Sequence, residues 1–366
     1  MANTLPYLKT YGVIKMLNKV NRRLVTGLSL SAVLLLSACA SPTQNENVEK
    51  VNAEEVKTEV IKPHLGLNQE PIPLKVERVG ENEVNVEMTA QITDIEIDKG
   101  EMYKAWTFNG EVPGPLVVVE EGDVINFTMK NMDPAIPHSM DFHAVRTSPS
   151  KNFTNVEPDE TGTFTYPADN PGVFMYHCGT APILSHIANG MHGVIIVKPK
   201  DGYPTDDQID KEFVMIQNEW YNYNDLEDFT NGSPKHVVFS TKALKEDDRN
   251  TNGDTFTLKD EPLLAKEGDR VRIYINNVGP NEVSSFHVVG TMFDYVYEDG
   301  NPNNVLEGMQ TIMLPASGGA VVEFEVVEEG SYPIVTHQFN HVQKGASAIL
   351  KVTKDGLDDE KATMSH

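Results

Sequence analysis

The chain has 366 residues, with 30 Lys and Arg against 54 Asp and Glu, which gives a formal net charge of −24. This length usually corresponds to two domains, and the 39% hydrophobic content is enough for packed cores. The acidic balance repels phosphate backbones, so nucleic-acid binding is excluded. The two cysteines, Cys39 and Cys178, are too few for a disulfide framework.

The first 39 residues have the organisation of a bacterial export signal. A basic stretch ends at Arg23, and a 13-residue apolar run follows from Leu24 to Leu36, which is too short for an ordinary spanning helix. The run leads into Ser-Ala-Cys39, which resembles a lipobox, so we expect acylation of Cys39. The protein is then exported and lipid-anchored to the outer face of the bacterial cell membrane. Met16 is an alternative start, and a plain signal peptide or a buried helix with an incidental cysteine is the alternative reading.

Residues 40–66 are predicted to form a flexible tether, because they are polar and lack turn residues and apolar periodicity. From residue 67 the chain changes to short apolar runs separated by Gly, Pro, Asn and Asp. Examples are Val124-Ile-Asn-Phe-Thr-Met and Val271-Arg-Ile-Tyr-Ile. This alternation predicts an all-β protein built from sandwiches or barrels.

The β region repeats itself. A run that begins at Pro115 and contains Glu-Gly-Asp recurs from Pro262, and Asp141-Phe-His-Ala-Val resembles Ser285-Phe-His-Val-Val. The offset of about 145 residues predicts two copies of one β fold. We therefore divide the chain into a signal (1–39), a tether (40–66), a first domain (67–202), a second domain (203–356) and a tail (357–366).

One group of residues has the composition of a copper site. Cys178 is followed by His186 and Met191, and His138 lies upstream. Two imidazoles, a thiolate and a weak thioether are the ligand set of a blue electron-transfer copper. The alternative for Cys178 alone is a small buried hydrophobic residue.

The alternation of side chains along a strand predicts a second group. His177 must face away from Cys178, and His143 faces away from His138 if that stretch is extended. Asp141 lies on the same face as His143. His177, His143 and Asp141 are therefore expected to meet on the outer face, where the two imidazoles form half of a metal site. The bond between His177 and Cys178 would connect the two sites.

Four further histidines carry no predicted role. His64 and His366 lie in the tether and the tail, and His236 has no partner in the sequence. His192 follows Met191 directly and points the other way, so we expect it at the surface. In the second repeat no cysteine corresponds to Cys178, and Glu282 lies roughly where His138 stands.

Two motifs, His138-Ser-Met-Asp-Phe-His143 and His177-Cys178 with His186 and Met191, occur in a chain with tandem repeats. With these motifs the sequence resembles the copper-containing nitrite reductases over roughly residues 67–355. The resemblance implies two tandem cupredoxin-like domains, each a Greek-key β-barrel or sandwich, assembled as a homotrimer with one type 1 and one type 2 copper per subunit. It also implies the role of each matching residue. The type 1 ligands are His138, Cys178, His186 and Met191; the type 2 ligands are His143, His177 and, from the neighbouring subunit, His337; Asp141 and His287 handle protons, and Val289 flanks nitrite. His341 is the alternative to His337, which we favour because it ends a strand-like run.

The expected activity is one-electron reduction of nitrite to nitric oxide and water. The electron donor is an external redox protein such as a cytochrome c or a small copper protein. A multicopper oxidase is the first alternative, but its trinuclear cluster needs His-X-His pairs and the sequence contains none. The second alternative is an electron-transfer or copper-holding lipoprotein with only the type 1 site, which would leave the outer histidines without a role.

Overall fold

The computed structural model describes residues 72, 74–244, 257–258 and 262–357. The expected signal and tether, with Cys39 and His64, lie outside the described residues, as does His366 in the expected tail. Within the described ranges, no helix has the length and apolar character needed to cross a membrane. The predicted all-β class is confirmed: strands dominate, and each helix is one or two turns long.

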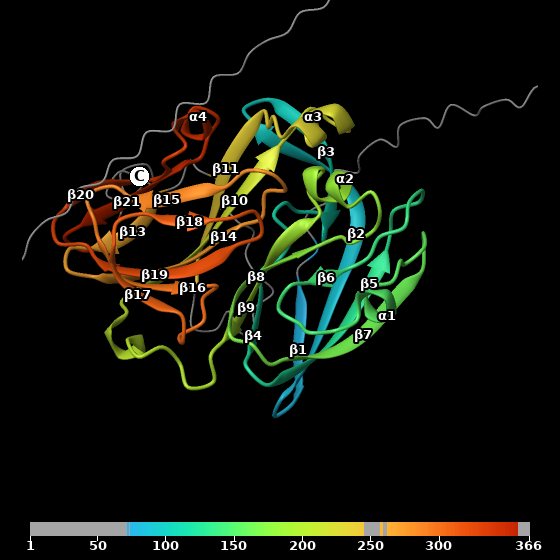
Figure 1. The fold of residues 1–366 in the computed structure, drawn as a ribbon, viewed down its shortest axis with the longest axis horizontal. Coiled ribbons are helices and arrows are strands. Elements are labelled where there is room, and N and C mark those ends of the chain that lie inside the picture. Colours follow the sequence, from blue (N-terminus) through green and yellow to red (C-terminus); the bar gives the residue numbers. More distant parts are fainter. Residues whose placement is uncertain (1–71, 73, 245–256, 259–261, 358–366) are drawn as a thin grey trace, which may run out of the picture. The chain divides into compact units, whose positions relative to one another are not determined.

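The first half of the described chain consists of two sheets, blue to green in Figure 1. A five-stranded sheet has the order β1-β2-β5-β7, with β3 paired to β2. Its strands are β1 (Lys75–Gly80), β2 (Glu83–Asp98), β3 (Glu101–Phe108), β5 (Asp123–Asn131) and β7 (Thr161–Ala168). A four-stranded sheet has the order β4-β9-β8-β6. Its strands are β4 (Val117–Glu120), β6 (Asp141–Phe142), β8 (Gly172–His177) and β9 (His192–Lys198). Buried side chains alternate with less buried ones along β5, as the sequence pattern predicts.

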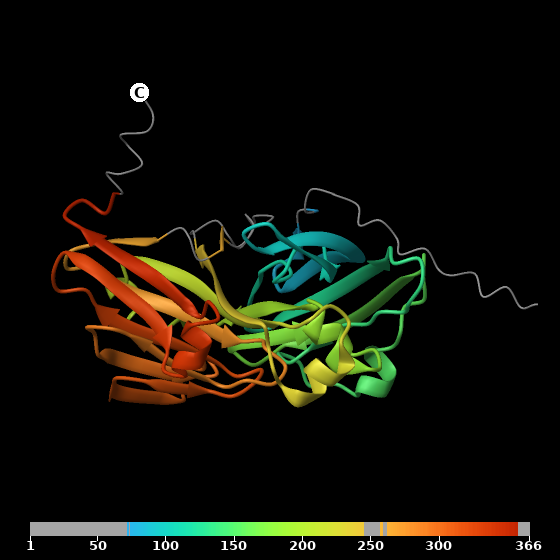
Figure 2. The same ribbon diagram turned by 90° about the horizontal axis from the view of Figure 1, so that it is seen from above.

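The second half also consists of two sheets, which lie on the yellow-to-red side in Figure 2. A seven-stranded sheet has the order β12-β11-β10-β14-β19-β16-β17. Its strands are β10 (Lys211–Trp220), β11 (His236–Ala243), β12 (Thr257–Leu258), β14 (Arg270–Asn277), β16 (Phe293–Glu298), β17 (Val305–Met309) and β19 (Gly319–Glu325). A five-stranded sheet has the order β13-β21-β20-β15-β18. Its strands are β13 (Leu263–Lys266), β15 (Ser284–Val288), β18 (Ile312–Leu314), β20 (Gly330–Thr336) and β21 (Ser347–Thr353).

Short helices follow equivalent strands in the two halves. In the first half α2 (Ile183–Ala188) comes between β8 and β9, and in the second α4 (Phe339–Val342) comes between β20 and β21. The other helices are α1 (Pro149–Asn152), the 3₁₀ helix η1 (Asp206–Gln208) and α3 (Leu226–Asn231). The four-stranded sheet β4-β9-β8-β6 has the same order as β13-β21-β20-β15, so the repeat in the sequence corresponds to a repeat in the fold.

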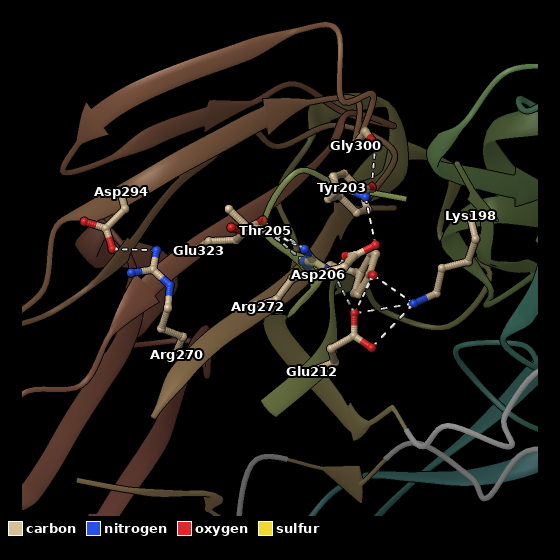
Figure 3. Close-up of polar contacts among 11 residues, drawn as sticks. Lys198, Tyr203, Thr205, Asp206, Glu212, Arg270, Arg272, Asp294, Gly300 and Glu323 are labelled. Atoms are coloured by element: carbon tan, nitrogen blue, oxygen red, sulfur yellow. Dashed lines mark hydrogen bonds and ion pairs between the residues drawn. The ribbon is translucent and has the colours of Figure 1, made fainter. Parts of the chain in front are cut away.

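An apolar cluster packs β8 and β9 of the first half against β10, β14 and β19 of the second. A buried charged cluster lies beside it (Figure 3). Arg272 bonds to Glu323 (2.7 Å) and Glu212 (3.1 Å), and Lys198 of the first half lies 3.4 Å from Glu212. Burial costs these charges hydration, which the ion pairs offset. A cavity of about 580 Å³ opens here, but no predicted site residue lines it, so we assign this cluster to holding the halves together.

Candidate metal centres

The structure brings His138, Cys178 and His186 together in the core of the first half. His138 precedes β6, Cys178 follows β8, and His186 lies on α2. One ligand atom of each lies within 4.8 Å of the others, and all three residues are buried. Met191 is fully buried directly before β9, and its carbonyl accepts a hydrogen bond from the N–H of Cys178 (3.1 Å). We call His138, Cys178, His186 and Met191 the buried cluster.

The surroundings of Cys178 favour ionisation of its thiol. Burial opposes the charge, but His138 Nδ1 at 3.8 Å and the N–H of Ser139 at 3.3 Å favour the thiolate, and the pKa of Cys178 is lowered. Burial likewise favours a neutral His138 ring, but Asp133 and the thiol raise the pKa of His138. A thiolate with two imidazoles is a ligand set that copper accepts.

Asp133 orients His138 and was missed in the sequence. Its carboxylate lies 3.2 Å from His138 Nε2 and is buried, so the ring presents Nδ1 to Cys178. Metal-binding histidines commonly use a carboxylate in this way. Asp133 lies two residues after β5 and only five residues before His138, so this spacing in the sequence could have indicated the pair. A further buried nitrogen, His186 Nε2, has no hydrogen-bond partner among the described residues.

The second group, which we call the outer cluster, consists of Asp141, His143 and His177. Ligand atoms of the three lie within 4.8 Å of one another. The Nε2 atoms of His143 and His177 are 3.0 Å apart, and Asp141 Oδ2 lies 3.9 Å from His177 Nε2. His177 Nδ1 donates to the carbonyl of Cys178 (2.9 Å), so Nε2 is the ring nitrogen that faces the outer cluster and is placed to bind a metal.

The outer cluster favours a neutral His143 ring. Loss of hydration and the nearby His177 ring lower the pKa of His143. His143 is nevertheless open on one side, where it lines a cavity of about 230 Å³. Two imidazole nitrogens that converge on one point, with an open side for an exogenous molecule, fit a catalytic metal better than a structural one.

The second half contributes a further pair of histidines. The rings of His287 and His337 are 5.1 Å apart between centroids, and His287 Nδ1 donates to the carbonyl of Gln310. His337 is exposed, and Val289, two residues after His287, is 41% exposed. Neither histidine belongs to a group of three metal-ligating side chains in the described chain. His341 is different, because it is buried and its Nε2 lies 3.4 Å from Glu282.

One expectation from the sequence is wrong. His192 is not at the surface: it is 1% exposed, because β9 lies in the interior of the protein and its side chains are buried on both faces. Burial lowers the pKa of His192 to about 4. Glu282, expected roughly at the position of His138, lies two residues before Ser284, which takes that position when the Glu-Gly-Asp turns of the two halves are aligned. His236, for which no partner was expected, lies 3.3 Å from Glu101.

The fold and the two clusters define a two-domain copper protein. Family models described as multicopper oxidase match residues 89–202 and 226–356. The copper-containing nitrite reductase of Neisseria gonorrhoeae is 38% identical over 295 residues, which cover 77% of this chain and 71% of that protein.

Solved structures agree. A copper nitrite reductase from Nitrosomonas europaea has a TM-score of 0.67 at 40% identity, covering 76% of this chain and 98% of that chain. One from Thermus scotoductus has a TM-score of 0.67 at 38% identity, covering 75% and 62%. The chain belongs to the copper-containing nitrite reductases, and copper is its cofactor.

Proposed function

We propose that this enzyme reduces nitrite to nitric oxide and water, consuming one electron and two protons. The observation that carries the proposal is the pairing of a buried thiol–imidazole cluster with an open imidazole cluster on adjacent residues, Cys178 and His177. Membership of the nitrite reductase family supports it. A multicopper oxidase is disfavoured because no His-X-His pair occurs in the sequence.

The two clusters would hold different coppers. His138, Cys178, His186 and Met191 would hold the type 1 copper, and His143 and His177 would hold the type 2 copper. Copper bound there supplies electron storage at the buried cluster and Lewis acidity with one-electron reduction at the outer cluster. His177 and Cys178 are consecutive residues, so their side chains and the backbone between them give the electron a covalent path from one cluster to the other.

Asp141 and His287 would handle the two protons. The Asp141 carboxylate lies beside His177, within the outer cluster where nitrite would bind. It is positioned to hydrogen-bond a nitrite oxygen and to transfer a proton to it. His287 would supply or relay the second proton, because an imidazole titrates close to neutral pH. Val289 would flank nitrite with apolar surface.

We propose that a neighbouring subunit completes the outer cluster with His337. Two observations support this: the outer cluster has only two imidazoles, and exposed His337 lies outside every group of three metal-ligating side chains found among the described residues. His341 is less suitable because it is buried and paired with Glu282. Repetition of such a head-to-tail contact closes a ring, here a homotrimer.

The electron donor is proposed to be a small redox protein, such as a cytochrome c or a copper protein. The helix that carries His186 offers a docking surface, because α2 contacts α3 and the two helices expose Ile183 (46%) and Leu226 (55%). Acylation of Cys39 would tether the enzyme to the outer face of the cell membrane.

Anaerobic turnover of nitrite with a reduced dye tests the function directly, with nitric oxide as the measured product. Copper analysis then separates the alternatives. The reductase holds about two coppers per subunit, whereas an electron carrier holds one and an oxidase with a trinuclear cluster holds about four. One copper per subunit with no nitric oxide would contradict the proposal.

A further inference from the structure

The two halves can be aligned residue by residue through strand register. Tyr176 on β8 pairs with Phe142 on β6 and with Gly193 on β9. Ile334 on β20 pairs in the same way with Val288 on β15 and with Ala348 on β21. These pairs alone do not fix where the alignment starts, but a Glu-Gly-Asp turn present in both halves does. The N–H of Glu121 donates to the carbonyl of Lys198 (2.8 Å), and the N–H of Glu267 donates to the carbonyl of Thr353 (3.0 Å). Lys198 therefore corresponds to Thr353 and Tyr176 to Ile334, and the neighbouring positions follow by counting along each strand.

This alignment identifies the residues of the second half that are equivalent to the buried cluster. The residues that correspond to His138, Cys178, His186 and Met191 are Ser284, Thr336, His341 and Ala346. We call these four residues the degenerate site. All are buried, and the hydrogen bond from the N–H of Met191 to the carbonyl of His186 recurs from Ala346 to His341, at 3.0 Å in both cases.

The degenerate site keeps the backbone of a copper site but lacks the thiolate and the thioether. Its one imidazole, on His341, lies beside the carboxylate of Glu282. His341 Nδ1 and Ser284 Oγ are buried and have no hydrogen-bond partner among the described residues. Without a soft ligand, this site does not select copper as the buried cluster does.

One hydrogen bond that Cys178 accepts in the first half is also accepted by Thr336, the equivalent residue of the second half. In the first half the N–H of Ser139 donates to Cys178 Sγ at 3.3 Å. At the equivalent place in the second half, the N–H of Ser285 donates to Thr336 Oγ1 at 3.0 Å. The same N–H also lies 2.9 Å from Gln338 Oε1, which accepts from the Thr336 hydroxyl. Thr336 thus retains the part of the cysteine's role that needs no metal.

This network surrounds His337. Thr336 and Gln338 precede and follow it, and the N–H of His337 donates to the carbonyl of Ser285 at 2.8 Å. His287 lies two residues beyond Ser285, so both histidines are attached to the same short segment of paired backbone. The positions of Thr336 and Gln338 therefore determine how His337 stands relative to His287.

We infer that the degenerate site now supports the shared copper site. Thr336 of the degenerate site, together with the neighbouring Gln338, acts as a positioning residue for His337. In the first half the equivalent site would hold copper next to His177, and in the second it holds a hydrogen-bond network next to His337. The inference rests on the proposed role of His337 as a ligand to the neighbouring subunit's copper.

The test is a double-mutant cycle on the full-length enzyme, because two acceptors share one donor. Thr336→Val and Gln338→Leu each leave Ser285 one acceptor, whereas the double variant leaves none. We expect each single variant to change copper affinity at the outer cluster by less than about threefold, and the double variant by about tenfold or more. Thr336→Ser restores the hydroxyl and should match wild type. Thr241→Val is the matched control, a buried threonine on β11 in the other sheet.

Copper affinity and the paramagnetic resonance signal of the non-blue copper are the readouts, and visible absorption of the buried cluster is the internal standard. An unchanged signal and affinity in the double variant would overturn the inference. If the double variant does not fold, Thr336→Val must still differ in its resonance signal from Thr336→Ser, and identical spectra would be equally decisive. Failure of the proposed function looks different, because wild type would then bind copper without producing nitric oxide.

Discussion

The two halves of this enzyme share one backbone arrangement and differ in a few side chains at matching positions. Where the first half has Cys178, the second has Thr336, and where the first has His138, the second has Ser284. One hydrogen bond is present in both halves: the N–H of Ser139 donates to the side chain of Cys178, and the N–H of Ser285 donates to the side chain of Thr336. The comparison indicates that both halves provide the frame for a metal site. If the buried cluster holds copper as proposed, the thiolate and its companions decide whether copper binds there.

The same register pairs Asp141 with His287. Both residues lie two positions before an outward-facing residue, His143 in the first half and Val289 in the second. If the subunits meet as proposed, two equivalent strand positions from neighbouring subunits supply the two proton-handling groups. One β-fold thereby furnishes an acid and a base of different chemistry at matching places.

The strongest test of the comparison removes the thiolate. Cys178→Ala should abolish the intense visible absorption, because no other soft ligand is available, while the copper of the outer cluster remains. Thr336→Cys is the counterpart in the second half. It should create no absorption, because Ser284 and Ala346 supply no further ligands. Retained colour in Cys178→Ala would refute the assignment of the buried cluster.

The second test concerns the ligand that each half contributes to the shared site. His143→Ala and His337→Ala should each be inactive as pure proteins, because each removes one ligand from every site. When the two variants are unfolded together and refolded as a mixture, about a quarter of the sites should regain all ligands by random assembly of a ring. The measurement is nitrite turnover of the mixture against refolded wild type.

Zero recovery, with wild type refolding well in parallel, would show that all ligands of a site come from one chain. If His341→Ala complemented His143→Ala and His337→Ala did not, the interface would stand and only the ligand would change. The outcome therefore separates the proposed assembly from the choice between two histidines.

The third test concerns proton transfer by Asp141, one of the two proton-handling residues. Asp141→Asn preserves the shape of the side chain but cannot transfer a proton, so nitrite turnover should fall by about 100-fold, within the range that general acid catalysis supplies. Both coppers should remain bound, since neither cluster loses an imidazole or the thiolate. Wild-type rates between pH 5 and 7 in this variant would exclude a catalytic role for Asp141.

Sequence reasoning predicted the β class, the repeat and the residues that form both clusters, because ligand spacing and strand alternation are local properties. It placed Glu282 roughly at the His138 position because the Phe-His pairs were aligned directly, and the alignment of the two folded halves differs from that one by two residues. Thr336 and Gln338 were missed because their roles depend on hydrogen bonds across strands, which no local pattern encodes. Asp133 was missed although it lies only five residues before His138. His192 was misplaced because alternation assumes that one face of a strand meets solvent, whereas β9 is buried on both.

His192 gives the smallest expected effect and bears on the same comparison, because the equivalent residue in the second half is Ser347. Burial holds the pKa of His192 at about 4, below its ordinary 6.5. An unfolded chain therefore binds a proton at His192 below pH 6.5 that the folded protein does not, so stability is lost as the pH falls through this range. By linkage this one residue should cost about 2 kcal/mol at pH 5 relative to pH 7.5. His192→Gln should lower that loss by the same amount in urea unfolding of the holoenzyme, whereas Ser347→Gln should leave the pH dependence unchanged. An equal loss in wild type and His192→Gln would mean that the acid sensitivity of the first half arises elsewhere.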